Sequence, residues 1–289
     1  MASTFKTIGL VVRSDMQSRQ QSIQQVVTVL ARHAEVRVHC LDFDEPMAGL
    51  SQLTLKQLVN DVDLVISLGG DGTLLTAARA LADLSTPLLG INLGRLGFLA
   101  DVSFDHFESY IDAVVEGRYT VEERFLIQGE FYQGDNLLSC NIALNDIILH
   151  SYESSRMIEY EVSSGGALIH IQRSDGVIVT TPTGSTAYAL SGGGPIMHPS
   201  LNTLAIVPIC PHTLSNRPIV LPADQPIEVR LGKDSTVAKV SYDGHSTMRF
   251  GQDNRVLITR YPRPLSLLHP EDYDYFSVLR AKLYWSASY

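Results

Sequence analysis

Asp63-Leu-Val-Ile-Ser-Leu-Gly-Gly-Asp-Gly-Thr73 is the stretch that decides the fold, because an apolar run leads directly into a glycine-rich turn. The run up to Leu68 has the length of a buried strand, and apolar residues at helical spacing follow the turn. A strand that ends in glycines and opens a helix forms a phosphate cradle, since glycines permit the turn and free N–H groups face the anion. The stretch therefore predicts an α/β fold with a phosphate-binding turn.

Asp71 is the unusual residue of this turn, because a phosphate repels a neighbouring carboxylate. Two roles in phosphoryl transfer fit it: binding a bridging metal ion, or taking a proton from an attacking hydroxyl group. A structural alternative is that Asp71 caps the helix that we expect to begin near Thr73. From the residues alone, both kinds of role stay open.

The composition of the chain limits its partners. With 289 residues and a hydrophobic content of 45%, it suits two domains, or one large one, with a full core. A net charge of −9 without a long basic run argues against nucleic acid and membrane surfaces as partners. No apolar stretch approaches the ~20 residues of a membrane span, and no signal peptide is visible, so we expect a cytoplasmic protein. Cys40, Cys140 and Cys210 are predicted to be buried free thiols.

The pattern of helix and strand signals in the sequence changes near Val121. Strand and helix signals alternate before it, which predicts a parallel sheet with helices on both faces. After it, helical periodicity fades and short β-rich runs are separated by turn residues, which is typical of an all-β sandwich. We predict a Rossmann-like α/β domain over residues 1–120, a β-sandwich-like domain over 121–269 and a helical tail over 270–289.

The tail is apolar and aromatic. Phe276, Leu279 and Leu283 fall on one helical stripe, and the only tryptophan, Trp285, follows them. We expect this tail to pack on the N-terminal domain or in a subunit interface.

A second constellation lies in the β-rich half, where Thr180-Thr-Pro-Thr-Gly-Ser-Thr-Ala-Tyr188 is followed by Ser191-Gly-Gly-Gly-Pro195. Its hydroxyls and glycine N–H groups are neutral donors suited to ribose and phosphate oxygens, although a threonine-rich turn between strands is an alternative. Asn145-Asp146 interrupts an apolar strand over Asn141–Leu149. We expect the two side chains to face opposite sides of a sheet, with binding and exposure both open.

Other polar residues are ambiguous by themselves. Arg173-Ser-Asp175-Gly176 fits a turn with an Asx-type hydrogen bond as well as a binding loop. Arg156 alone indicates a surface cation, and His245 a turn histidine. No Gly-x-x-x-x-Gly-Lys-Ser/Thr loop and no protein-kinase motif set occur, and no lysine lies in a glycine-rich region. The charge of a polyphosphate must then be met by a metal ion, arginines and backbone dipoles.

Several motifs occur in one order along nearly the whole chain, and together they resemble the bacterial NAD kinase family. They are GGDGT at 69–73, GRLGFL at 94–99, Asn145-Asp146, QRSDG at 172–176, TPTGSTAYALSGGGPI at 181–196, PHTLSNRP at 211–218 and HPEDY at 269–273. The GGDGT motif alone is shared with several sugar and lipid kinases, so the combination carries the resemblance.

The resemblance implies an activity and an architecture. The γ-phosphate of ATP would pass to the 2′-hydroxyl of the adenosine ribose of NAD, giving NADP and ADP, with Mg²⁺ or Mn²⁺ as the divalent cation. An N-terminal α/β domain and a C-terminal β domain would hold the site between them, in a homodimer or homotetramer. The implied catalytic base is Asp71. The implied contacts of the nucleotide substrates are Gly72, Asn145, Asp146, Arg156, Arg173, Asp175, Thr183, Gly184, Ser185, Thr186, Ala187, Tyr188 and His245.

Two other functions would account for part of these motifs. A lipid kinase of the diacylglycerol type shares GGDGT but predicts an apolar groove and a basic or amphipathic membrane face, which the charge of −9 disfavours. A non-catalytic NAD-binding module predicts damage at the motif aspartate, and Asp71 is intact.

Overall fold

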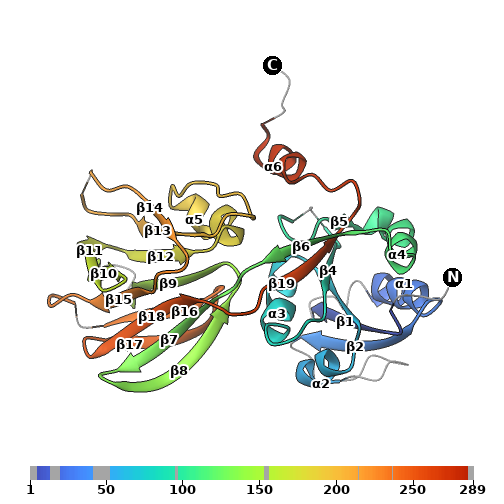
Figure 1. The fold of residues 1–289 in the computed structure, drawn as a ribbon, viewed down its shortest axis with the longest axis horizontal. Helices are drawn as coiled ribbons and strands as arrows, with labels where there is room; N and C mark the ends of the chain where they lie inside the picture. Colours follow the sequence, from blue (N-terminus) through green and yellow to red (C-terminus); the bar gives the residue numbers. More distant parts are fainter. Residues whose placement is uncertain are drawn as a thin grey trace. The chain divides into compact units, whose positions relative to one another are not determined.

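The computed structural model divides into two compact units (Figure 1). The first unit takes the chain up to Glu123 and again from Leu265, and the second runs from Arg124 to Pro264. The boundaries expected from the sequence, after residues 120 and 269, stay predictions. The structure describes residues 5–13, 20–41, 53–94, 97–152, 156–213, 215–235 and 237–285.

The first unit is built on one sheet, which has seven strands within the described residues. In pairing order these are β2 (Glu35–Leu41), β1 (Thr7–Arg13), β3 (Leu64–Gly69), β4 (Leu88–Asn92), β19 (Leu265–His269) and β6 (Thr120–Arg124), while β5 (Val102–Ser103) pairs with β4. The pairs from β2 to β19 are parallel, and so is β4 with β5. The chain thus returns from the second unit to complete this sheet with β19.

Helices cover both faces of this sheet, as predicted (Figure 1). Apolar residues of α1 and α4 share one core with alternate residues of β1, β3 and β4. On the other face, a Cβ at Gly9 would meet Leu58 of α2 and one at Gly90 would meet Leu74 of α3, so these glycines let the helices approach the sheet closely. The helices are α1 (Gln20–Leu30), α2 (Leu55–Asn60), α3 (Asp71–Ala80), η2 (Phe104–His106), α4 (Phe107–Val115) and α6 (Tyr275–Leu283).

The second unit is an antiparallel sandwich of two sheets, which confirms the predicted β-sandwich-like fold. One sheet has the order β11 (Ala167–Ser174), β10 (Ile158–Ser164), β15 (Ile227–Leu231), β18 (Asn254–Arg260), β7 (Ile127–Gln133) and β8 (Asn136–Ala143). The other has the order β14 (Ile219–Pro222), β13 (Thr203–Ile209), β12 (Gly176–Thr180), β9 (Asp146–Ser151), β16 (Val237–Tyr242) and β17 (His245–Gly251). Inward-facing residues of both sheets form one core.

A short helical segment covers the outer face of the second sheet. The 3-10 helix η3 (Thr183–Thr186) and α5 (Tyr188–Ser191) follow β12 directly. Ala189 of α5 packs with Ile178 and Val207 in a smaller core on that face. The threonine-rich motif therefore leaves the end of β12 and folds back over its own sheet.

The predicted continuous strand over Asn141–Leu149 is wrong. β8 ends at Ala143 in one sheet and β9 begins at Asp146 in the other, so the chain changes sheets at Leu144-Asn145. Asn145 and Asp146 therefore do not lie on opposite faces of one strand. Apolar residues fill both flanks because each flank is a buried strand, which explains why the sequence looks continuous.

Two further expectations need correction. Cys40 is buried, but Cys140 and Cys210 are exposed, although all three are free thiols. The tail helix forms as predicted, with Asp274 as its N-cap, but its buried residues are Val278 and Leu279. Phe276, expected on the packed stripe, is 55% exposed. Across the described residues, no helix combines the length and the apolar character that crossing a membrane requires.

Candidate functional site

The glycine-rich turn forms the expected strand–turn–helix junction. β3 ends at Gly69, and α3 begins at Asp71 with Gly70 as its N-cap. A Cβ at Gly69 would collide with the Thr73 hydroxyl, so only glycine fits there. No side chain caps the N-terminus of α3. The Thr73 N–H donates to the Gly70 carbonyl at 3.0 Å, whereas the N–H groups of Asp71 and Gly72 have no acceptor within the described residues and can face an anion, as a phosphate cradle requires.

Asp71 does not cap its own helix, so the structural alternative considered for it is wrong. Its carboxylate instead accepts backbone hydrogen bonds from the turn that follows Gly97. Oδ2 accepts the N–H of Phe98 at 3.0 Å, and Oδ1 accepts those of Leu99 at 3.2 Å and Ala100 at 3.1 Å. Two sequence motifs, GGDGT and the Gly-Phe-Leu end of GRLGFL, therefore form one structure; Arg95 and Leu96 lie outside the described residues.

Gly97 is required by this arrangement. A Cβ at this position would overlap the Asp71 carboxylate, within van der Waals distance of both oxygens. The three N–H donors hold the carboxylate in one orientation. A carboxylate oxygen has two lone pairs, and from the described residues Oδ1 accepts two hydrogen bonds and Oδ2 one, so Oδ2 keeps a lone pair for a hydroxyl proton or a cation.

In the second unit, the change of sheets at Asn145 forms a rigid platform. Asp243 accepts the backbone N–H groups of Leu144 at 3.0 Å, Asn145 at 2.8 Å and Asp146 at 3.2 Å. Thr181 secures the other side, because its N–H donates to the Asn145 carbonyl at 2.9 Å and its hydroxyl to the Leu144 carbonyl at 2.6 Å. These bonds replace the ladder partners that the interrupted strand lacks.

Sequence reasoning missed Asp243, although a signal for it existed. Asp243 and Gly244 both have positive φ, 49° and 72°, in the two-residue turn between β16 and β17. Asp-Gly between two β runs is the strongest short-range signal for such a turn. The Asp-Gly signal predicts the hairpin. It does not predict the hydrogen bonds of Asp243 to the platform, because those partners lie 97 to 99 residues away in the sequence. His245 follows this turn and is exposed.

Two side chains of the platform have properties typical of a functional site, namely a shifted pKa at Asp146 and an unused acceptor at Asn145. Asp146 is 4% exposed, and burial together with the negative charge of Asp243 raises the pKa of its carboxyl to about 7. The Asn145 Oδ1 atom is buried without a hydrogen-bond partner, which indicates an acceptor awaiting a donor. A perturbed acid beside an unused amide acceptor is typical of a binding or catalytic site.

The hydroxyl groups of the threonine-rich turn mostly form hydrogen bonds inside the protein, so they stabilise the turn rather than serve as donors to a ligand. Ser185 donates its hydroxyl proton to the Pro182 carbonyl at 2.6 Å, and Thr186 donates to Thr183 at 3.3 Å. Thr183 accepts a hydrogen bond from Arg124 at 3.3 Å, and a Cβ at Gly184 would collide with the Asn145 carbonyl. Ala187 and Tyr188, at the end of this turn, keep accessible surface.

Arg173 and Asp175 lie at the opposite end of β12 from this platform. Thr180 pairs with Asp146, whereas the Asp175 carbonyl accepts the N–H of Ser151. Asp175 and Asp146 are therefore roughly 16 Å apart along the strands, at about 3.3 Å per residue. The structure does not bring together all the residues predicted to bind the dinucleotide.

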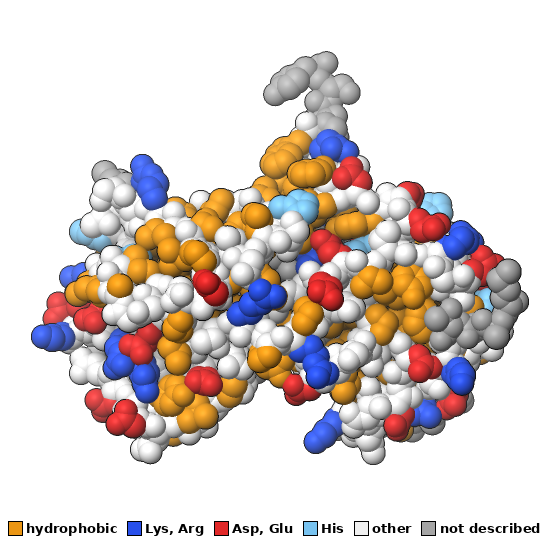
Figure 2. Space-filling view, viewed as in Figure 1, with side chains coloured by type: hydrophobic (Ala, Val, Ile, Leu, Met, Phe, Trp, Pro, Cys, Tyr) orange, Lys and Arg blue, Asp and Glu red, His pale blue; other side chains and the backbone are white. Residues whose placement is uncertain are grey.

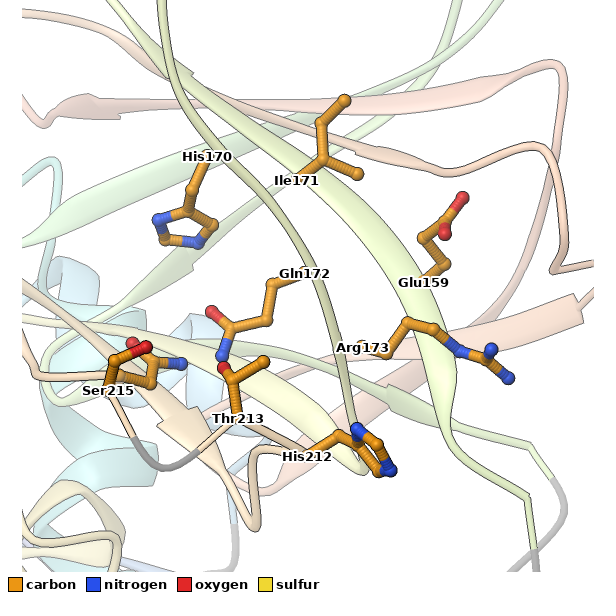
Figure 3. A pocket seen from close by; sticks show the side chains of 9 residues that line it. Glu159, His170, Ile171, Gln172, Arg173, His212, Thr213 and Ser215 are labelled. Carbon is orange, nitrogen blue, oxygen red and sulfur yellow. The ribbon is translucent and has the colours of Figure 1, made fainter.

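Arg173 lines a cavity of about 360 Å³ on the β11 side of the sandwich (Figure 3). Figure 3 shows Gln172 and Thr213 close together in it, while Arg173 extends away from them. Nε2 of the buried Gln172 has no hydrogen-bond partner. Arg156 lines a separate hollow with Ser151 and Asp234. Leu214, between the lining residues Thr213 and Ser215, lies outside the described residues.

The two units together define a class of protein. A glycine-rich turn with a fixed carboxylate, in one chain with a buried Asn-Asp platform, suits phosphoryl transfer involving a nucleotide.

Comparison with known proteins makes the class specific: the chain belongs to the ATP-NAD kinase family. Residues 7–119 match the ATP-NAD kinase N-terminal domain and residues 144–269 the ATP-NAD kinase C-terminal domain. The chain is similar to the NAD kinase of Thiobacillus denitrificans, with 41% identity over 288 residues and 99% of each chain covered.

Solved structures agree with this assignment. A yeast NADH kinase complexed with NADH superposes with a TM-score of 0.86 at 25% identity, covering 98% of this chain and 89% of that chain. An NAD kinase from Archaeoglobus fulgidus in complex with ATP gives a TM-score of 0.72 at 27% identity, covering 96% and 98%.

Proposed function

We propose that the protein transfers the γ-phosphoryl group of ATP to the 2′-hydroxyl of the adenosine ribose of NAD, producing NADP and ADP. The observation that carries this proposal is the Asp71 carboxylate, which three backbone N–H groups fix at a glycine-rich strand–helix junction. The family relatives support the choice of substrates, because they include a kinase bound to NADH and another bound to ATP.

Asp71 acts as the general base in this proposal. The ribose hydroxyl is not activated by itself, since its pKa lies far above 7, and a carboxylate assists by taking the proton as the phosphorus–oxygen bond forms. Oδ2 is the atom that accepts the proton, because one of its lone pairs is unused while both of those on Oδ1 are occupied. ADP leaves with the electron pair of the broken bond. The turn at Gly97 keeps the base oriented throughout.

The second unit binds the dinucleotide in this proposal. Asn145 offers a buried amide oxygen to a hydroxyl or amino group, and Asp146 can hold a ribose hydroxyl in either protonation state near neutral pH. The remaining proposed contacts are Gly72, Arg156, Arg173, Asp175, Thr183, Gly184, Ser185, Thr186, Ala187, Tyr188 and His245. Because the hydroxyls of Thr183, Ser185 and Thr186 all bond to other groups of the protein, we propose that these residues hold Ala187 and Tyr188 in place at the site.

A divalent cation, Mg²⁺ or Mn²⁺, fits the residues if it arrives with ATP. Within the described part of the chain, no group of three or more His, Cys, Asp or Glu side chains is placed to hold a metal ion. Mg²⁺ commonly binds through one or two carboxylates together with substrate phosphates and water, and the open lone pair of Asp71 Oδ2 suits one such contact. When bound, the cation would neutralise the charge of the transferring phosphates.

We also propose that the protein is a homodimer or homotetramer in the cytoplasm. Large hydrophobic side chains are exposed on the edge strand β11, where Leu168 and Ile171 are 60% and 55% exposed. Figure 2 shows further hydrophobic side chains on the surface of α6. Exposed apolar residues on a sheet edge suit contact with a second copy. Free cysteines, two of them exposed, suit a reducing compartment.

The activity is tested by incubating the purified protein with ATP, Mg²⁺ and NAD and assaying NADP with an NADP-specific dehydrogenase. We expect NADP and ADP to form in equal amounts. NADP formation no faster than in a mixture without protein would overturn the proposal. Substituting NADH for NAD in a parallel reaction measures the choice of acceptor.

A further inference from the structure

The imidazole of His269, at the end of β19, is enclosed between two carboxylates in the first unit. Nδ1 lies 2.8 Å from Asp101 Oδ2 and Nε2 lies 3.2 Å from Glu122 Oε2, while the His269 and Asp101 side chains are only 2% and 5% exposed. The Nε2 contact lacks hydrogen-bond geometry and is an ion pair. Tyr273 stacks on the ring, with centroids 3.9 Å apart.

The surroundings of His269 are acidic. Burial disfavours the charged ring, but the hydrogen bond to Asp101 and the negative charges of Asp101 and Glu122 outweigh it, and the pKa of His269 is raised. The Tyr110 hydroxyl belongs to the same surroundings, because burial and the charges of Asp101 and Asp272 raise its pKa. A buried carboxylate that loses its cationic partner is strongly destabilised, so the ring and Asp101 hold each other in place.

Asp101 directly follows the turn that orients Asp71. Its neighbour Ala100 donates its N–H to Asp71 Oδ1 at 3.1 Å. The backbone of Ala100 has little freedom, because it packs so closely on β4 that a Cβ at Gly90 would lie 2.7 Å from the Ala100 Cα. After Asp101, Val102 pairs with β4. Asp101, the partner of His269, therefore joins the strand that pairs with β4 to the turn that binds Asp71.

We propose that His269 is a positioning residue for phosphoryl transfer: its ring holds Asp101, and Asp101 fixes the turn whose N–H groups orient the Asp71 carboxylate. This inference rests on the proposed role of Asp71. A shift of the base by about 1 Å can cost on the order of 10²-fold in rate, so loss of the tether should lower kcat. Binding of NAD, which we assign to the second unit, should change little.

The test uses variants of the full chain and two readouts. His269→Gln and Asp101→Ala remove the tether, whereas Asp101→Asn keeps an oxygen that can accept the Nδ1 proton. His33→Gln is the matched control, because His33 also pairs with a carboxylate, Asp112 at 2.9 Å, on the surface of the same unit. Steady-state kinetics give kcat and the KM for NAD. Hydrogen exchange of the peptide that contains Phe98, Leu99 and Ala100 reports the turn in the absence of ligand.

We expect His269→Gln and Asp101→Ala to lower kcat by about 10- to 100-fold, with the KM for NAD within about threefold of the unmodified value. The amides of Phe98 to Ala100 should exchange faster in both. Asp101→Asn should recover most of kcat and of the protection, and His33→Gln should behave as the unmodified protein.

Unchanged kcat and unchanged protection in folded His269→Gln would overturn the inference, as would equal losses in Asp101→Asn and Asp101→Ala. If the unmodified protein makes no NADP while exchange still rises in His269→Gln, the tether exists and the proposed function has failed instead. If both His269→Gln and Asp101→Ala fail to fold, Asp101→Asn decides: kcat lowered tenfold or more with normal protection contradicts the inference, and near-normal values of both support it.

Discussion

At the scale of single residues, Asp71 and Asp243 use their carboxylates in the same way, although they lie in different units. Each accepts three successive backbone N–H groups from a distant segment. Charge-assisted bonds of this kind are roughly twice as strong as neutral ones, and they fix both the acid and the backbone that it binds. Asp71 therefore orders the turn from Phe98 to Ala100 and is itself held in place by it. Asp243 orders the crossing between the two sheets and holds the backbone of Asp146.

Asp146 should make the stability of the protein depend on pH. Its pKa of about 7 in the folded state is above the value of about 3.9 expected for the unfolded chain. Between about pH 4 and pH 7 the folded state keeps a proton that the unfolded state has released, so the contribution of this group to stability falls as pH rises. Asp146→Asn cannot titrate, so its melting temperature relative to the unmodified protein should rise by several degrees from pH 5 to pH 8.

Thermal unfolding at both pH values measures this difference. Asp253→Asn, an exposed change on the same unit, controls for the loss of one negative charge. A difference between Asp146→Asn and the unmodified protein that stays constant with pH would contradict the raised pKa.

At the scale of elements, the strongest sequence signals were local and the missed features were not. The β3–α3 junction follows from one contiguous run of residues, and α1, β2 and α6 follow from their own periodicity. The crossing at Asn145, the return of β19 to the first sheet and the tether on Asp101 depend on partners far along the chain. Edge strands such as β14 and β17 escaped prediction because they are short or polar.

The turn after Gly97 should tolerate no side chain at its first residue. Gly97→Ala places a Cβ against the Asp71 carboxylate, so the base must move and its hydrogen bonds to Phe98, Leu99 and Ala100 must weaken. We expect kcat to fall by about 10²-fold or more. Gly94→Ala is the control from the same motif, because the nearest atom to its Cβ is Asn92 Oδ1 at 3.8 Å. Equal kcat values for the two variants would show that the contact at Gly97 does not matter.

The tail helix should contribute to stability and assembly. α6 buries Val278 and Leu279, and Lys282 lies over the ring of Phe98, 5.6 Å from its centroid. Tyr284 and Trp285 are 80% and 61% exposed in the single chain, which makes them candidates for a contact with a second copy. Deleting residues 273–289 should lower the melting temperature or reduce the mass measured by light scattering. If neither changes, the tail has no such role.

At the scale of the whole molecule, the sequence predicted the two kinds of fold, while the roles of the candidate site residues stay predictions. Asp71, Asn145 and Asp146 lie at well-defined structural positions, whereas Arg173 and Asp175 lie roughly 16 Å from Asp146 along the strands. A motif match identifies residues but carries no distances, so it could not separate these groups. Asp243 and His269 act through other residues, which explains why no pattern assigned them a chemical role.

Activity should require a divalent cation. None of the lysines lies in a glycine-rich region, and the described residues hold no preformed cluster of three metal-ligating side chains. The charge of ATP therefore needs a cation that comes with it. We expect chelation to abolish NADP formation and added Mg²⁺ or Mn²⁺ to restore it. Full turnover in excess chelator would contradict this expectation.

The central claim, that Asp71 is the base for phosphorylation of NAD, is tested most directly by the rate of NADP formation in Asp71→Asn. This variant should also be less stable, because Asn keeps only one acceptor oxygen and its amide nitrogen loses the hydrogen bond from Phe98 on one side or those from Leu99 and Ala100 on the other. We expect the free energy of unfolding to fall by about 1–3 kcal/mol.

Asp63→Asn is the matched control, since Asp63 accepts the N–H groups of Lys6 and Thr7 in the same unit. The account predicts that kcat falls by about 10²–10⁴-fold in folded Asp71→Asn and stays near normal in Asp63→Asn. A kcat for Asp71→Asn equal to that of Asp63→Asn would contradict it.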